Sequence, residues 1–167
     1  FNLDLNMIHF PLSTANAFLP GVATLKGDID GSMTVEGNMA RPILNGWLAF
    51  DSAAVTVDML GSTLELPGEH IPVENNIVRL NNLKIKACND NPLTVAGTVD
   101  LSELSSPGID LSFNASNMQL VNTVKAPRGA DVFGKLFLGL NATARGNLDF
   151  LTVKAKADIL PGTNVTY

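Results

Sequence analysis

Apolar and polar residues alternate along most of this 167-residue chain, and this alternation limits its fold more than any other feature. From Leu25 to Met39 every odd position holds an apolar residue or glycine, and every even position between them holds a polar residue. Because successive side chains of a β-strand point to opposite faces, this period of two predicts a half-buried strand. Similar alternation returns at Leu93–Leu101, Ile109–Ala115, Leu136–Ala144 and Leu151–Ile159, and more briefly at Ala53–Met59 and Leu83–Ala87.

Glycine, proline and asparagine gather between these segments, as they do in turns. The clusters lie at Arg41-Pro42, Pro67-Gly68, Asn75-Asn76, 89–92, 106–108, 127–129 and Pro161-Gly162. They predict an all-β, antiparallel fold in which one face of the sheet is apolar and the other faces solvent. A helical pattern occurs once, near residues 13–19, with Ser13 as the expected N-cap and Pro20-Gly21 as the stop. Residues 120–133 are interpreted as a loop or a distorted strand.

Composition excludes several classes of protein. The chain is 46% hydrophobic and 16% charged, yet it lacks the run of about 18 apolar residues that a membrane-spanning helix needs. A net charge of -5 with scattered Lys and Arg does not suit a nucleic-acid partner. The single Cys88 rules out a disulfide framework or a cysteine-based zinc site within the chain.

Two observations concern domain organisation. The chain starts with Phe1 and shows no signal-peptide pattern, so we expect residues 1–167 to be one β-rich segment of a longer, elongated protein. The motif Gly37-Asn38-Met39 returns 109 positions later as Gly146-Asn147-Leu148. This weak repeat predicts two β-meander modules, at about residues 20–100 and 101–167.

The apolar face of such a sheet must be removed from water, since each large aliphatic side chain left exposed costs roughly 1.5–3 kcal/mol. A second sheet would give a sandwich, closure would give a barrel, and curvature would give a trough that can hold acyl chains. Composition alone favours an ordinary core over a trough.

No pattern of catalytic or metal-binding residues stands out. Asp28-Ile29-Asp30-Gly31 resembles the start of a calcium loop, but the required glycine and glutamate are missing further along. Ser62, His70 and Asp58 have no nucleophile motif around them, so we do not expect an enzyme. His9 stands where the alternation places an apolar residue, which predicts a partly buried, hydrogen-bonded histidine.

The order of several glycine and proline motifs points to a family. These motifs are Ile8-His9-Phe10-Pro11-Leu12-Ser13, Phe18-Leu19-Pro20-Gly21, Leu25-Lys26-Gly27-Asp28-Ile29-Asp30-Gly31, and the stretch from Val35 to Leu48 with its Gly37, Pro42 and Gly46. Together with the ending Leu160–Tyr167 they resemble the C-terminal region of the TamB family of AsmA-like envelope proteins. The resemblance covers residues 8–50 well and the rest of the chain loosely.

This resemblance implies an elongated, curved antiparallel sheet, the β-taco or U-shaped trough, with an apolar concave face. It implies a protein of the Gram-negative periplasm, anchored to the inner membrane outside this segment. The implied roles are phospholipid transport between the membranes and outer-membrane protein assembly beside a BamA-like, TamA-type partner. No catalytic, metal or cofactor site carries over, and the expected ligands are phospholipid acyl chains or detergent.

Three hypotheses about function remain open at this point. The first is an acyl-chain groove, which rests on the alternation together with the family resemblance and has as candidate lining Leu25, Ile29, Met33, Val35, Leu93, Val95, Val99, Leu136, Leu138 and Leu140. The second is a protein-binding module whose open edge pairs with strands of outer-membrane proteins by β-augmentation. The third is an inert structural β-sandwich with a dry core.

Overall fold

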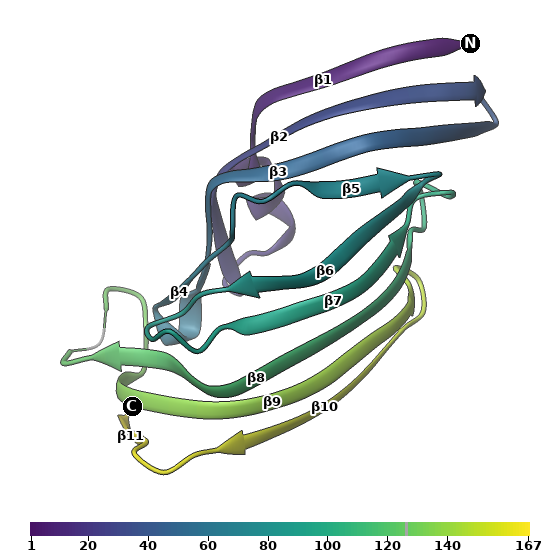
Figure 1. Cartoon of the computed structure of the whole chain (residues 1–167). Helices are drawn as coiled ribbons and strands as arrows, with labels where there is room; N and C mark the ends of the chain where they lie inside the picture. The colour runs from purple at the N-terminus through teal and green to yellow at the C-terminus, as the bar shows by residue number, and fades with distance from the viewer. Residues whose placement is uncertain (126) are drawn as a thin grey trace.

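The computed structural model describes residues 1–125 and 127–167, the side chain of Phe18 excepted. Of the chain, 68% is strand, and the strands form one open, curved, antiparallel sheet (Figure 1). The strands are β1 (Asn2–Pro11), β2 (Ala23–Asn38), β3 (Arg41–Val57), β4 (Ser62–Glu65), β5 (Ile71–Glu74), β6 (Ile77–Ile85), β7 (Leu93–Asp100), β8 (Gly108–Thr123), β9 (Phe133–Asn147), β10 (Leu151–Ile159) and β11 (Asn164–Thr166).

The strands follow one another across the sheet almost in chain order. The path is β1-β2-β3-β5-β6-β7-β8-β9-β10, with β4 beside β3 and β11 beside β9. The predicted all-β, antiparallel, taco-like fold is therefore confirmed. The sandwich alternative is wrong, because the strands of the described residues belong to a single sheet and no second sheet covers its apolar face.

The helical content is limited to two 3-10 turns in the described part of the chain, η1 (Leu12–Phe18) and η2 (Asp58–Leu60). The short helix expected near residues 13–19 is present, but the position preceding η1 is Pro11, so Ser13 is not its N-cap. The Asn16 side chain accepts a hydrogen bond from the Leu25 backbone N–H at 2.7 Å and donates to its carbonyl oxygen at 3.1 Å. Asn16 thus provides hydrogen-bond partners for the backbone of Leu25 at the edge of β2, beyond the last residue of β1. None of the described helices could span a membrane.

Two uncertain stretches of the sequence are also explained. Residues 25–39, which suit one long strand or two short ones, lie in the single strand β2 and the turn that follows it. Of residues 120–133, β8 includes those up to Thr123, and Phe133 begins β9; Ala126 between them lies outside the described residues.

Local irregularities occur part-way along several strands. The pairing register shifts between Met7 and Phe10 in β1, between Asp51 and Ala54 in β3, between Leu80 and Leu83 in β6, and between Ala115 and Met118 in β8. A non-glycine residue with positive φ lies at or beside each shift: His9, Ser52, Asn82 and Asn117. Because a β-bulge bends a strand and increases its twist, these positions account for the curvature of the sheet.

Two glycines on the apolar face show how closely the strands approach. Gly46 has φ 152° and Gly97 has φ 130°. A Cβ at Gly46 would overlap the backbone oxygen of Ser32, and one at Gly97 would overlap that of Asp110. The curved sheet therefore needs glycine at these positions, where a side chain would push neighbouring strands apart.

We expect Gly97→Ala to lower the free energy of unfolding by about 2–3 kcal/mol, because both the backbone conformation and the neighbouring strand oppose a Cβ. Urea unfolding followed by circular dichroism measures this change. Gly21→Ala is the control: Gly21 has φ 70° but no atom within 4 Å of its added Cβ. Equal effects of the two substitutions would mean that close strand approach at Gly97 contributes nothing.

Candidate functional site

One row of residues crosses the whole sheet from edge to edge. Each member is directly paired with the next, so all of them project from the same face. Every member is apolar or glycine: Leu5, Met33, Gly46, Val73, Val78, Val99, Ile109, Gly146 and Leu151. The sheet therefore carries a continuous apolar band at right angles to its strands.

Parallel rows widen this band. One runs through Leu80, Gly97, Leu111, Ala144 and Val153, and the next through Leu83, Val95, Phe113, Ala142 and Ala155. Two buried clusters lie on this face. The first consists of Met33, Leu44 and Val73, and the second of Ile71, Leu83 and Val95.

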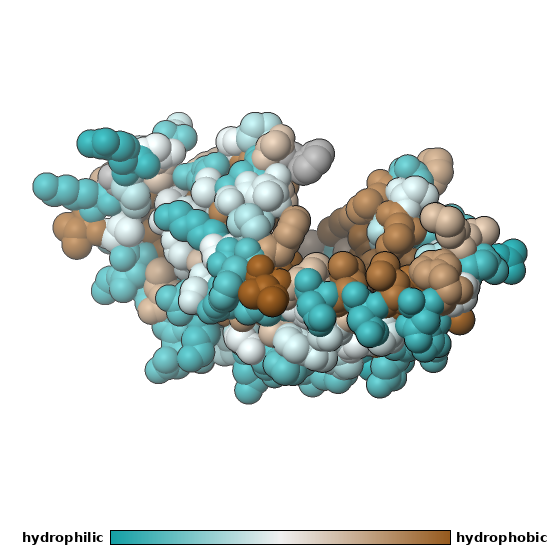
Figure 2. Space-filling model, turned by 90° about the horizontal axis from the view of Figure 1, so that it is seen from above, coloured by the Kyte–Doolittle hydropathy of each residue, from teal (hydrophilic) through white to brown (hydrophobic). Residues whose placement is uncertain are grey.

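Curvature buries the middle of the apolar face and leaves its margins open. Val73, in the short central strand β5, is 1% exposed although the described residues form no second sheet over it. At the two edge strands exposure rises to 42% at Leu5 and 75% at Ile159. Figure 2 shows a hollow between two raised parts of the molecule, with hydrophobic residues at its bottom and on its right side and hydrophilic residues over the outer surface. We call this hollow the trough.

The ten residues predicted to line a groove all occupy the apolar face of the sheet. Met33 and Val95 are buried in the two clusters. The other eight are half-buried. Leu93 and Leu140 lie in one row, through Ala115. Leu25 lies apart from the rest, in a separate row with Val55 of β3 and Leu64 of β4.

Several residues of the trough were missed by sequence reasoning. Leu44, Leu48 and Phe50 of β3 pair with Val35, Gly31 and Ile29 and complete the band between β2 and β5. Their signal was alternation at even positions, which switches to odd positions after the bulge at Ser52. On β10, Leu151, Val153 and Ile159 fall in the same alternating pattern that identified the strand.

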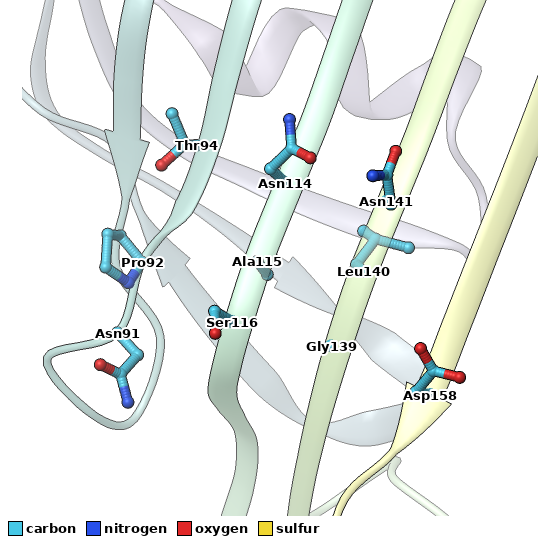
Figure 3. A pocket seen from close by; sticks show the side chains of 10 residues that line it. All are labelled: Asn91, Pro92, Thr94, Asn114, Ala115, Ser116, Gly139, Leu140, Asn141 and Asp158. Carbon is cyan, nitrogen blue, oxygen red and sulfur yellow. The ribbon is translucent and has the colours of Figure 1, made fainter.

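The convex face is polar and lightly charged. An open depression of about 520 Å³ is lined by polar residues, among them Asn91, Thr94, Asn114, Asn141 and Asp158, and also by Ala115 and Leu140 of an apolar row. Figure 3 shows Asn114 and Asn141 projecting from the neighbouring strands β8 and β9, where the two residues are directly paired. The lining thus combines polar residues with members of an apolar row, so the depression does not define a separate polar site.

A group of titratable residues lies at the bend of β1, β2 and β3. The Nδ1 atom of His9 lies 3.7 Å from carboxylate oxygens of Asp30 and Asp51 and 3.9 Å from one of Asp28. The prediction of a partly buried His9 is wrong, because the β1 bulge turns its side chain outward and leaves it 64% exposed. These ligand types suit a divalent cation. An exposed cluster of this kind does not by itself indicate one.

The three residues considered as a catalytic set have other partners. The Ser62 hydroxyl donates to the backbone oxygen of Leu120, and Asp58 accepts a hydrogen bond from Thr24. His70 stacks on Trp47, with ring centroids 4.0 Å apart and an interplanar angle of 2°. Each side chain thus has a structural contact that accounts for its place.

Comparison with known proteins gives one match. A family model described as TamB C-terminal domain matches residues 81–167, which is just over half of the chain and includes β7 to β11. No curated protein and no solved structure matches the chain. The matched region contains six of the ten predicted trough residues, on β7 and β9.

Cys88 offers a chemical probe of the structure beside β8. Partial burial raises the pKa of its thiol, while hydrogen bonds involving Ser62 and the Asn122 backbone oppose part of that shift. We therefore expect Cys88 to react more slowly with iodoacetamide at pH 7 than a free cysteine does, and its rate to keep rising above pH 9. Ser62→Ala removes one opposing hydrogen bond and should slow the reaction at pH 8 further. A rate that levels off below pH 8.5 would contradict this.

Proposed function

The chain belongs to the TamB C-terminal domain family, and from that premise we propose that its trough holds the acyl chains of phospholipids in transit between the inner and outer membranes. The family belongs to the Gram-negative envelope and consists of transport and assembly modules rather than enzymes. The proposal places the segment in the periplasm, as part of a protein anchored to the inner membrane.

The observation that carries this proposal is the apolar row from Leu5 to Leu151. It crosses all nine strands of the main path without a polar side chain. With strands about 4.8 Å apart, the eight intervals of this row span roughly 38 Å along the curved sheet. A bilayer core about 30 Å thick holds two layers of chains, so one acyl chain reaches roughly 15 Å and fits within the row.

The energetics suit a mobile aliphatic ligand. Each methylene transferred from water contributes about 0.8 kcal/mol, so a sixteen-carbon chain gains on the order of 12 kcal/mol before the cost of ordering it. Half-buried aliphatic residues such as Leu138 and Leu140 offer contact area without a fixed pocket. Binding of this kind depends on continuous apolar area, so it lets a chain slide from row to row.

A polar head group is expected to remain in water at the open side of the trough, since the trough itself presents apolar rows. The proposal also includes delivery to a BamA-like outer-membrane partner of the TamA type. Support for this partner is limited to the general association of the family with outer-membrane partners.

Leu138→Asp tests the proposal, because it puts a charge on the apolar face of β9 beside Met118 and Ile159. We expect the purified variant to lose co-purifying phospholipid, as measured by native mass spectrometry and lipid extraction, while its β circular-dichroism signal is retained. Ile29→Asp should act in the same way on β2.

Asn141→Asp is the matched control, since it adds the same charge to the same strand on the convex face. This variant should keep its lipid. The groove proposal fails if folded Leu138→Asp protein carries as much phospholipid as the wild type, or if the wild type carries none and refuses a fluorescent fatty acid.

A second candidate function is strand addition at the β10 edge. Strand β10 is paired with β9 through nine consecutive residues, and every residue of it is exposed. Its lysines Lys154 and Lys156 project from the polar face and its apolar residues from the other. An amphipathic strand of an outer-membrane protein would continue both faces of the sheet by β-augmentation.

Backbone pairing makes this second function sensitive to proline, because proline has no N–H to donate. We expect an amphipathic strand peptide to bind the chain, and single prolines within it to weaken binding at least about tenfold where an N–H faces β10. Fluorescence anisotropy of the labelled peptide measures this. Binding that tolerates proline at every position would argue for side-chain recognition in the trough instead.

A further inference from the structure

Large apolar side chains project from one rim of the sheet, outside the trough. They lie in the β2–β3 turn, the β7–β8 connection and the β9–β10 turn, which Figure 1 shows on the right of the sheet. Met39 is 92% exposed, Leu104 62%, Leu148 64% and Phe150 82%. Exposed apolar residues gathered in one region of a protein surface mark an interaction site. We call these three connections the apolar rim.

The same turn structure occurs twice in the rim, at the two copies of the repeated motif. The Asn38 side-chain oxygen accepts backbone hydrogen bonds from Ala40 and Arg41 at 3.0 and 2.9 Å. The Asn147 side-chain oxygen accepts them from Asp149 and Phe150 at 3.1 and 2.9 Å. In both turns the residue after the asparagine stands at the tip, and it is Met39 in one and Leu148 in the other. A polar residue would suit the turn equally well.

The three connections adjoin one another. Met39 and Leu104 line one open hollow of about 370 Å³ between the β2–β3 turn and the β7–β8 connection. The Ser106 hydroxyl donates to the Asp149 carboxylate at 2.7 Å and joins that connection to the β9–β10 turn. The three connections are therefore neighbours along one rim of the sheet, with polar residues between their apolar tips.

The rim meets the trough directly. Strand β10 follows the Leu148–Phe150 turn and begins at Leu151, the last member of the apolar row that crosses the sheet. Strand β2 ends next to the Met39 turn, five residues beyond Met33 of the same row. The exposed tips thus extend the apolar surface of the trough over the ends of the strands.

We propose that the apolar rim inserts into the surface of an electrically neutral phospholipid bilayer, so that lipid passes between bilayer and trough over this side of the sheet. The inference rests on the proposed function and adds where the bilayer is met. The charged residues of the three connections are Glu103 and Asp149, and Arg41 and Asp100 stand at the adjoining strand ends, which gives no excess of positive charge. Electrostatic attraction to anionic lipid is therefore not the source of binding.

The shape of the rim favours a fluid partner over a folded protein. Its apolar residues stand on the tips of separate turns, and polar residues such as Asn38, Ser105 and Asp149 lie between them. A protein partner would need a separate pocket for each tip. The interfacial layer of a bilayer receives tips of different heights, since head groups move apart around each one.

The triple variant Met39→Ser, Leu148→Ser, Phe150→Ser tests this inference. We expect it to bind phosphatidylcholine–phosphatidylethanolamine vesicles at least about tenfold more weakly than the wild type in a flotation assay, because three apolar side chains no longer leave water. Adding phosphatidylglycerol to the vesicles should not strengthen wild-type binding. The control is Val22→Ser, Met59→Ser, which removes residues of similar exposure at the opposite ends of β2 and β3.

Uptake of a monomeric fluorescent fatty acid reports the trough independently of the rim. Normal uptake by the triple variant, together with lost vesicle binding, would support the inference. Wild-type vesicle binding by the triple variant would overturn it, as would equal loss in the control. Wild-type protein that binds only anionic vesicles, or no vesicles, would overturn it too. If the wild-type protein does not take up the fluorescent fatty acid, that result counts against the proposed function instead.

Discussion

A single-layer sheet with one apolar face and no covering layer can withdraw that face from water only by curving over it. This chain does so by local means. Bulges at His9, Ser52, Asn82 and Asn117 bend four strands part-way along their length, and glycines such as Gly97 leave room on the concave side where strands crowd. Burial is consequently graded. Val73 at the centre is almost fully buried, whereas the apolar residues of the edge strands remain partly exposed.

This gradient of burial distinguishes the open, curved sheet from a fold with a closed core. In a sandwich the second sheet would cover the margins as well as the centre, and no apolar surface would be left for a ligand. Here the same row that forms the core between β3 and β7 continues to both edges as accessible surface. Stability and ligand binding therefore use one continuous surface, so the residues that fold the sheet are neighbours of those that would hold an acyl chain. The family match to residues 81–167 covers the part of this surface that runs from β7 to the β10 edge.

Alternation identified most strands because successive side chains of every regular strand point to opposite faces of the sheet. It succeeded on β2, β7 and β9, where the ten candidate residues lie. It did not reveal that Leu44, Leu48 and Phe50 of β3, which alternate regularly before the bulge at Ser52, pair with β2, because the period of a strand does not specify its partner. A signal for the bulges was present: Asn81-Asn82 and Ser116-Asn117 offer residues that tolerate positive φ. The expected burial of His9 was wrong because it assumed that β1 continues without a bulge.

The sequence by itself determined that the chain is β, that it has an apolar and a polar face, and where most of its turns fall, because these depend on the order of neighbouring residues. The cluster Arg41-Pro42 is an exception, since both residues belong to β3 and the turn lies just before them. Tertiary structure alone decided the curvature and the cross-strand register, since both depend on pairing between residues far apart in the chain. Register aligns Leu5 with Leu151 through seven intervening residues. It also brings Met39, Leu104 and Phe150 to one rim, although more than a hundred positions separate the first from the last.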